Sequence, residues 1–191
     1  MTRLRSARGQ SMVEFAMVLP LILLLVLGVI ESGYALLDEH VVTKLSREGA
    51  NLISRNTSLQ DALTAMKTMT TSPVNFDASS RVIFSVIMKG QTVGTTNYNK
   101  DFLYQRYSYG AIAGASKIAT RGSGSFGPAP EYQAVNADGD ANLQVTNMPV
   151  VIAAPGGMIY ITEIYSTHKV ITPFDKFGVT MPKTLYSIAY F

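Results

Sequence analysis

The sequence predicts an α+β fold: a long N-terminal helix that crosses a membrane and continues as an amphipathic helix, then a short helix and an antiparallel β-sheet in an exported domain. Three observations lead to this expectation. Residues 15–30 (FAMVLPLILLLVLGVI) form a run of sixteen residues without a polar side chain. The sequence after this run keeps the periodicity of a helix, with apolar residues three and four positions apart. Further along, stretches rich in β-branched and aromatic residues are typical of strands.

The apolar run is long enough to cross a bilayer. Counted from Met12 it has 19 residues, which gives roughly 28 Å of helix against a hydrocarbon core of about 30 Å. Arg3, Arg5 and Arg8 precede it, and no acidic residue lies among the first nine. Because basic residues favour the cytoplasmic side, we expect a single-pass protein with a cytoplasmic N-terminus and a periplasmic or extracellular C-terminal domain.

A removed secretory signal is the competing interpretation, because signal peptides also begin with basic residues before an apolar stretch. This stretch is longer than a usual signal core, and Glu14 and Pro20 interrupt it. The small-residue pattern beyond it, Gly33-Tyr34-Ala35, matches a signal-peptidase site poorly. We therefore expect the helix to remain on the mature protein, with a kink or a loosened backbone hydrogen bond at Pro20.

A single helix is predicted from Met12 to Ser54. Its second half is amphipathic, and we expect its apolar stripe to pack against the protein's own sheet rather than to form a seam with a partner, although in a fibre the same helix could do both. The stripe comprises Tyr34, Leu37, Val41, Leu45, Gly49 and Leu52. The expected organisation is a cytoplasmic leader (1–9), a transmembrane helix (10–30), an amphipathic continuation (31–55) and an exported α+β domain (56–191).

The exported part is predicted to contain one short helix and several strands. Ser58 caps the helix, with Asp61 at the fourth position of a capping box, and the helix ends before Pro73. The stretch from Arg81 to Met88 is apolar on both faces, so it predicts a central strand. Further strands are expected at 101–109 and 158–170, with a short partner strand at 150–153. A long exposed loop is expected at 119–141, and residues 183–191 are left unassigned.

Composition excludes several classes of function. The net charge of +3 arises from the leader, because without its three arginines 13 basic residues face 13 acidic ones. We therefore expect no nucleic-acid partner. The chain has no cysteine, which rules out disulfides, thiol catalysis and thiolate metal sites. No cofactor is expected.

Two loop segments resemble known ligand-binding motifs. Residues 122–127 match G-x-G-x-x-G, but Pro128 follows where a pyrophosphate-binding helix would have to begin, so we expect a loop. Asp138, Asp140 and Asn142 alternate as calcium ligands do, without the closing glutamate of an EF-hand. They are a weak candidate calcium site beside the simpler interpretation as an Asp/Gly turn. No other metal site is expected.

The sequence contains no pattern typical of catalysis. His40 and His168 lack the neighbouring residues of a hydrolase or a zinc site. We expect both to be polar surface residues. Serine and aspartate are frequent, but no nucleophile elbow occurs. The protein is therefore not expected to be an enzyme.

Glu14 is the residue whose position near the membrane carries the largest free-energy cost. An acidic side chain near lipid costs on the order of 2.5 kcal/mol or more unless it is paired. Cleavage after Gly9 would place the new α-ammonium on Gln10, four residues before Glu14 on the same helix face and at the positive end of the helix dipole. The ammonium of one subunit could equally meet the glutamate of a neighbour. A glutamate at the headgroup boundary of a plain signal anchor is the alternative.

These residues carry a family resemblance. The arrangement G-QSMV-E-F, followed by Pro20, the apolar run, E-x-G at 31–33 and REGA at 47–50, closely resembles the TadE-like pseudopilins of tight-adherence pilus systems. The resemblance implies cleavage by a prepilin peptidase between Gly9 and Gln10, with Glu14 and Phe15 as the pair for peptidase recognition and subunit docking. It covers residues 8–50, about a quarter of the chain.

The resemblance implies a minor pseudopilin that takes part in assembling a tight-adherence (Flp-type) pilus, because the chain is too long for the major pilin of such systems. Its expected place is the bacterial inner membrane. The expected partners are the membrane, the prepilin peptidase, other pilins and pseudopilins, and the pilus assembly platform. Whether the subunit enters the finished pilus stays open. The alternative function is a signal-anchored exported binding module or cell-surface enzyme that uses the helix only as a tether.

Overall fold

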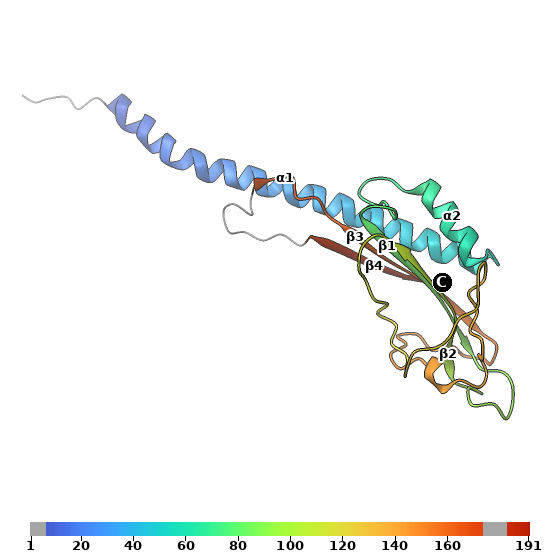
Figure 1. The fold of residues 1–191 in the computed structure, drawn as a ribbon. Coiled ribbons are helices and arrows are strands. Elements are labelled where there is room, and N and C mark those ends of the chain that lie inside the picture. Colours follow the sequence, from blue (N-terminus) through green and yellow to red (C-terminus); the bar gives the residue numbers. More distant parts are fainter. Residues whose placement is uncertain (1–6, 174–182) are drawn as a thin grey trace, which may run out of the picture. The chain divides into compact units, whose positions relative to one another are not determined.

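The computed structural model describes residues 7–173 and 183–191 and has the predicted α+β fold (Figure 1). Two helices, α1 and α2, precede a four-stranded antiparallel sheet with the strand order β2-β1-β3-β4. The elements are α1 (Ala7–Ser54), α2 (Leu59–Met69), β1 (Ser80–Lys89), β2 (Asp101–Gly110), the short 3₁₀ helix η1 (Ala141–Leu143), β3 (Met158–Thr167) and β4 (Thr184–Tyr190).

Contacts divide the chain into two compact units. One comprises residues 1–37 and 170–181, and the other comprises 38–169 and 182–191. Helix α1 therefore contributes its first part to one unit and its last turns to the other. The division predicted from the sequence, at residues 9, 30 and 55, refers to the membrane and stays a prediction.

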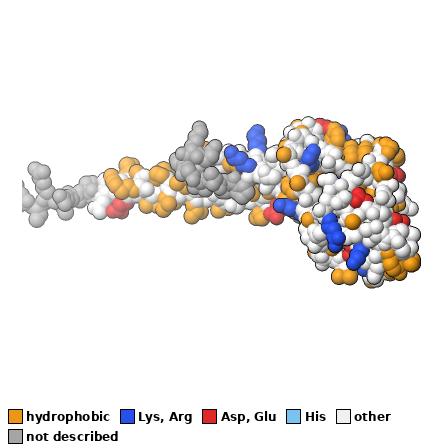
Figure 2. Space-filling view, turned by 60° about the horizontal axis from the view of Figure 1, so that its bottom comes forward, with side chains coloured by type: hydrophobic (Ala, Val, Ile, Leu, Met, Phe, Trp, Pro, Cys, Tyr) orange, Lys and Arg blue, Asp and Glu red, His pale blue; other side chains and the backbone are white. Residues whose placement is uncertain are grey.

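The first part of α1 is apolar and exposed. The helix starts earlier than the predicted Met12, ends at the predicted Ser54 and continues through Pro20. The kink expected at Pro20 stays a prediction. Figure 2 shows hydrophobic side chains along the visible face of this part, and Met17, for example, is 75% exposed. By length and composition α1 could cross a membrane.

The last turns of α1 pack into the protein core. Of the predicted stripe, Leu45 is buried, and Val41 and Leu52 are partly buried and pack against the core, so the prediction is correct in this region. It is wrong further upstream, because Tyr34 and Leu37 are exposed. The sheet belongs to the unit that begins at residue 38, so the earlier stripe residues do not belong to the unit that contains its core.

Gly49 allows the helix to approach its neighbours closely. A Cβ atom at this position would lie 2.8 Å from Sδ of Met66 on α2 and 2.8 Å from Cγ2 of Thr162 on β3. The absence of a side chain lets α1, α2 and β3 meet at one point.

Helix α2 begins at the predicted cap. The Ser58 hydroxyl accepts a hydrogen bond from the Asp61 amide at 3.1 Å and donates one to the Asp61 carboxylate at 2.7 Å. Leu59, Ala62 and Met66 are buried along one face of this helix. The apolar face of α2 therefore packs in the same core cluster as the last turns of α1.

Strand β1 is the central strand that its apolar sequence predicted. Val82 and Phe84 pack with α1 and α2 on one face of the sheet. Ile87 packs on the other face with Leu103 of β2 and Ile161 of β3, under the loops that follow β2. Burial on both faces explains why this strand has no polar alternation.

Two expectations for the second half of the chain need correction, and one unassigned segment forms a strand. β3 ends at Thr167, three residues before the predicted end. Residues 150–153 form no strand; Ile152 is buried instead, and its carbonyl accepts a hydrogen bond from Nζ of Lys89 at 2.8 Å. The unassigned tail forms β4, which pairs with β3. A strand of seven residues at the sheet edge leaves little periodic signal in the sequence.

Candidate functional site

The predicted processing site lies in the first turn of α1. Gln10 and Glu14 share one face of the helix, and Nε2 of Gln10 donates a hydrogen bond to Oε1 of Glu14 at 3.0 Å. Phe15 is 61% exposed, and a Cβ atom on Gly9 would meet nothing within 4 Å. The structure thus brings Gln10 and Glu14 together and leaves Gly9 and Phe15 accessible.

Part of the predicted topology signal lies outside the described residues. This applies to Arg3 and Arg5, and nothing is described of the Arg8 side chain. Pro20 lies inside the exposed part of α1. The predicted roles of these residues therefore stay predictions.

Local helix physics makes the Gly9–Gln10 bond accessible. α1 begins at Ala7, and the first four amide groups of any helix have no partner within the helix. Glycine also has a low helix propensity, about 1 kcal/mol below alanine. The first turn can therefore open at low cost.

Glu31 is a buried carboxylate that sequence reasoning named only as part of a motif. The residue is 1% exposed. Its Oε2 accepts hydrogen bonds from the backbone amide of Thr172 at 2.8 Å and from the Thr172 hydroxyl at 2.7 Å. The Ile171 amide donates to the same oxygen at 3.1 Å. Three donors on a remote segment hold this acid beside the end of the apolar run.

Asp38 and His168 form a second long-range pair. The Oδ2 atom of Asp38 lies 2.7 Å from Nδ1 of His168, whose side chain is 2% exposed. The expectation that His168 is a surface residue is therefore wrong, because the Asp38 carboxylate provides the partner that a buried imidazole needs. The expectation for His40 is correct, since it is exposed.

Glu163 lies fully buried at the centre of β3 and organises the sheet face that points away from α1. Its carboxylate accepts hydrogen bonds from the Ser116 hydroxyl, from the Lys117 amide at 2.7 Å and from the Tyr186 hydroxyl at 2.8 Å. Burial and the negative charge of Glu163 raise the pKa of Tyr186 above its ordinary value. Burial lowers the pKa of Arg106, although Glu163 acts against this shift. The Ser116 and Lys117 donors fix a loop on the sheet, and the Tyr186 hydroxyl connects β4 with β3, which indicates a structural role.

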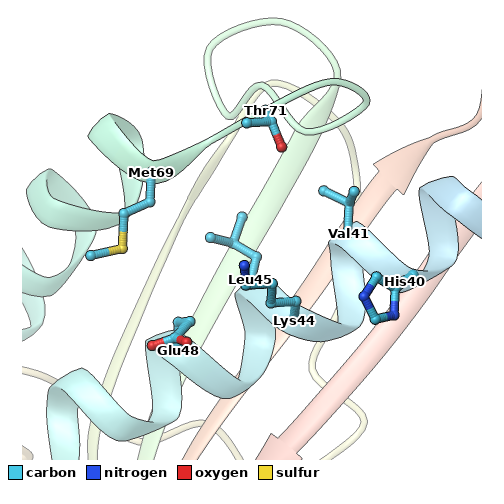
Figure 3. Close-up of a pocket in the computed structure, with 7 residues that line it drawn as sticks. All are labelled: His40, Val41, Lys44, Leu45, Glu48, Met69 and Thr71. Atoms are coloured by element: carbon cyan, nitrogen blue, oxygen red, sulfur yellow. The ribbon is translucent and has the colours of Figure 1, made fainter.

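A groove of about 490 Å³ lies between α1 and the end of α2 (Figure 3). Val41 and Leu45 form its apolar side, and His40, Lys44 and Glu48 lie on the same helix. Met69 and Thr71 close it from the α2 side. Within the described residues, no hydrogen bond or ion pair joins the side chains of His40, Lys44 and Glu48.

The two aspartates of the weak calcium candidate, Asp138 and Asp140, already accept hydrogen bonds from the protein. An Asp140 oxygen accepts a hydrogen bond from the Asn142 amide at 2.9 Å and caps η1. Oδ2 of Asp138 accepts one from the Thr92 hydroxyl at 2.9 Å. Within the described residues, no three acidic, histidine or cysteine side chains gather as metal ligands would. Residues 122–127 are a loop, as expected, and no helix follows them directly.

Comparison with known proteins identifies one region of the chain. Residues 9–51 match the family model described as TadE-like protein. No curated protein and no solved structure matched the chain. The match confirms the resemblance noted at residues 8–50 and links this region with tight-adherence pilus assembly and with a membrane. It includes Gly9, Gln10, Glu14, Phe15 and Glu31, and it ends before the sheet.

Proposed function

We propose that this chain, TadE-like over residues 9–51, is a minor pseudopilin: a non-enzymatic, membrane-anchored subunit that takes part in assembly of a tight-adherence pilus. A prepilin peptidase cuts it between Gly9 and Gln10. The mature subunit keeps α1 as its inner-membrane anchor, with the sheet on the periplasmic or extracellular side. Its partners are the peptidase, other pilins and pseudopilins, and the assembly platform.

The observation that carries this proposal is the junction at the start of α1. Gln10 and Glu14 lie one turn apart and are already hydrogen bonded at 3.0 Å. Cleavage before Gln10 would place an α-ammonium group in the same turn, where a carboxylate stabilises it and the helix dipole favours the carboxylate. The apolar side chains that follow are exposed, and neighbouring pilin helices or lipid would cover them.

The first test is the intact mass of the protein isolated from its native membrane. The proposal expects a mass that corresponds to a chain beginning at Gln10. A chain that retains its leader, or one cut near Ala35, would refute it.

A matched pair of glycine variants tests the cleavage position. Gly9→Val should abolish processing, whereas Gly33→Val should be processed like the wild type. At both positions an added side chain has free space in the structure, so folding differs little between the two variants. Equal processing of both variants would contradict the proposed site.

A second pair tests the role of the charge. Glu14→Gln should leave processing largely intact and reduce pilus assembly, because the proposed ammonium–carboxylate pair is lost. Glu39→Gln removes a carboxylate from an exposed position of the same helix and should leave assembly unchanged. Normal pilus numbers in the Glu14→Gln strain, counted by electron microscopy, would exclude the docking role.

The alternative is an exported binding module or surface enzyme with a plain tether. Replacing residues 1–30 with an unrelated signal anchor distinguishes the two. A tethered module keeps its cellular function after the exchange, whereas a pseudopilin loses pilus assembly because its helix is an assembly surface.

A further inference from the structure

A polar pocket of about 430 Å³ lies at the end of the sheet where β1 ends and β2 begins. This volume falls within the range of about 300 to 1,000 Å³ that is usual for small-molecule sites. It is lined by Lys89, Lys100, Arg121, Asp101, Gln144 and Thr146, among others. The lining is rich in charged, amide and hydroxyl groups, which suits a hydrophilic ligand.

The pocket carries an excess of positive charge. Oδ1 of Asp101 lies 3.8 Å from Nζ of Lys89, so the charges of these two residues largely offset each other. Within residues 7–173 and 183–191, neither the Lys100 ammonium nor the Arg121 guanidinium has an ion pair or a side-chain hydrogen bond. Without its leader arginines the chain has equal numbers of basic and acidic residues. The two unpaired cations therefore give this pocket a positive charge that the rest of the chain does not have.

Backbone hydrogen bonds hold the two cations on a common frame. The Lys100 carbonyl accepts from the Gly90 amide at 2.9 Å, and the Arg121 amide donates to the Gln144 carbonyl at 3.0 Å. The Val145 amide donates to the Asp101 carbonyl at 2.9 Å, which closes the frame. The backbone at Lys100 and Arg121 is therefore held in place before a ligand binds. Binding then costs less conformational entropy.

We propose that this pocket binds an acidic saccharide unit, a sugar that bears a carboxylate, from a surface polysaccharide. Lys100 and Arg121 would hold the carboxylate, because a guanidinium can form two parallel hydrogen bonds to it. The sugar hydroxyls would meet Thr146 and the amide groups of the lining. A polysaccharide is available to a domain outside the cell, so the inference rests on the proposed export, although binding itself can be measured in isolation.

Binding is tested with the full-length protein in detergent, by calorimetric titration with tetragalacturonate. Maltotetraose, which is neutral, and a short polyglutamate peptide, which is acidic but not a sugar, serve as comparison probes. We expect tetragalacturonate to bind, to bind more weakly at high salt, and to bind at least about tenfold more tightly than either comparison probe.

A charge-matched pair of double variants locates the site. Lys100→Gln with Arg121→Gln should weaken tetragalacturonate binding about tenfold or more, since two charge-assisted contacts are lost. Arg55→Gln with Lys169→Gln removes the same charge from exposed positions outside the pocket and should change affinity less than about twofold. The thermal midpoints of both proteins should match the wild type, because none of the four side chains has a partner in the described residues.

The proposal fails if tetragalacturonate does not bind the wild-type protein or if both double variants lose affinity equally. Equal binding of maltotetraose would show that the pocket does not recognise the negative charge of the ligand. Equal binding of polyglutamate would assign the pocket to an acidic protein partner instead. None of these outcomes depends on leader cleavage or pilus formation, so failure here is distinct from failure of the proposed pseudopilin function.

Discussion

Glu31 fixes a segment that lies about 140 residues further along the chain. Glu31→Ala would leave the amides of Ile171 and Thr172 without their acceptor. Each hydrogen bond to a charged group contributes about 1.5 to 3 kcal/mol, so we expect amide exchange at these two residues to accelerate by about ten- to a hundredfold. Hydrogen–deuterium exchange of the full chain in detergent measures this. Glu39→Ala, at an exposed position of α1, is the control, and unchanged protection in Glu31→Ala would contradict the prediction.

The Asp38–His168 pair should show strong energetic coupling. Both side chains are largely buried, and the two atoms lie 2.7 Å apart. Removing either partner takes a charged or hydrogen-bonding group away from a largely buried neighbour, which destabilises the folded protein. In a double-mutant cycle with Asp38→Asn and His168→Gln, we expect a coupling free energy of about 1 to 3 kcal/mol. Additive effects on the free energy of unfolding would mean that the pair does not interact in solution.

Tyr107 predicts a loss of stability at high pH. Burial and the polar interaction with Tyr132 raise the pKa of Tyr107 from 10.0 to about 12, and the centroids of the two stacked rings lie 4.0 Å apart. Between these pH values the unfolded chain releases this proton and the folded protein retains it, so stability falls as pH rises. Tyr107→Phe should reduce this fall between about pH 10 and pH 12, measured by chemical denaturation. Tyr98→Phe, at an exposed tyrosine, should leave the profile unchanged.

Gly49 is a position of α1 where the packing leaves no room for an added side chain. Gly49→Ala would place a methyl group 2.8 Å from the stiff Thr162 side chain, and we expect a loss of about 1 to 3 kcal/mol in the free energy of unfolding. Gly33→Ala adds the same group to the same helix where nothing lies within 4 Å. It should be neutral or stabilising by up to about 1 kcal/mol, because alanine favours the helix. Equal thermal midpoints would show that α1 can shift away from β3.

The elements that the sequence predicted well are those whose signal is local and long. α1, α2, β1 and β2 have apolar periods or caps that span several residues, and all four are found where expected. The errors lie in short segments. Residues 150–153 are apolar because Ile152 fills the core from a loop, and β4 depends on pairing with β3 rather than on its own pattern.

The same distinction separates the parts of the site. Gln10 and Glu14 lie one turn apart, so their contact could be inferred from helix geometry. Glu31 meets Thr172, and Asp38 meets His168, only because the chain returns to α1 after β3. Lys100 and Arg121 line one pocket across a loop. No periodic pattern encodes such contacts, although an acid directly after an apolar run, as at Glu31, signals that a partner is needed.

The two compact units predict that the sheet domain folds without the apolar part of the chain. Both clusters of buried apolar side chains lie entirely within residues 38–191. A chain that begins at Asp38 should therefore be soluble without detergent and unfold in a single cooperative transition, followed by circular dichroism on heating.

A chain that begins at Asn56 lacks Val42, Leu45 and Ile53, which are buried in the first cluster. Each of these side chains contributes about 1.5 to 3 kcal/mol by burial, against a total stability of about 5 to 15 kcal/mol. The shorter chain also loses the hydrogen bond of 2.9 Å between the Ser46 and Ser187 hydroxyls, which connects α1 with β4. We expect it to show no cooperative transition, and a stable fold in this shorter chain would mean that α1 is an anchor alone and not part of the domain core.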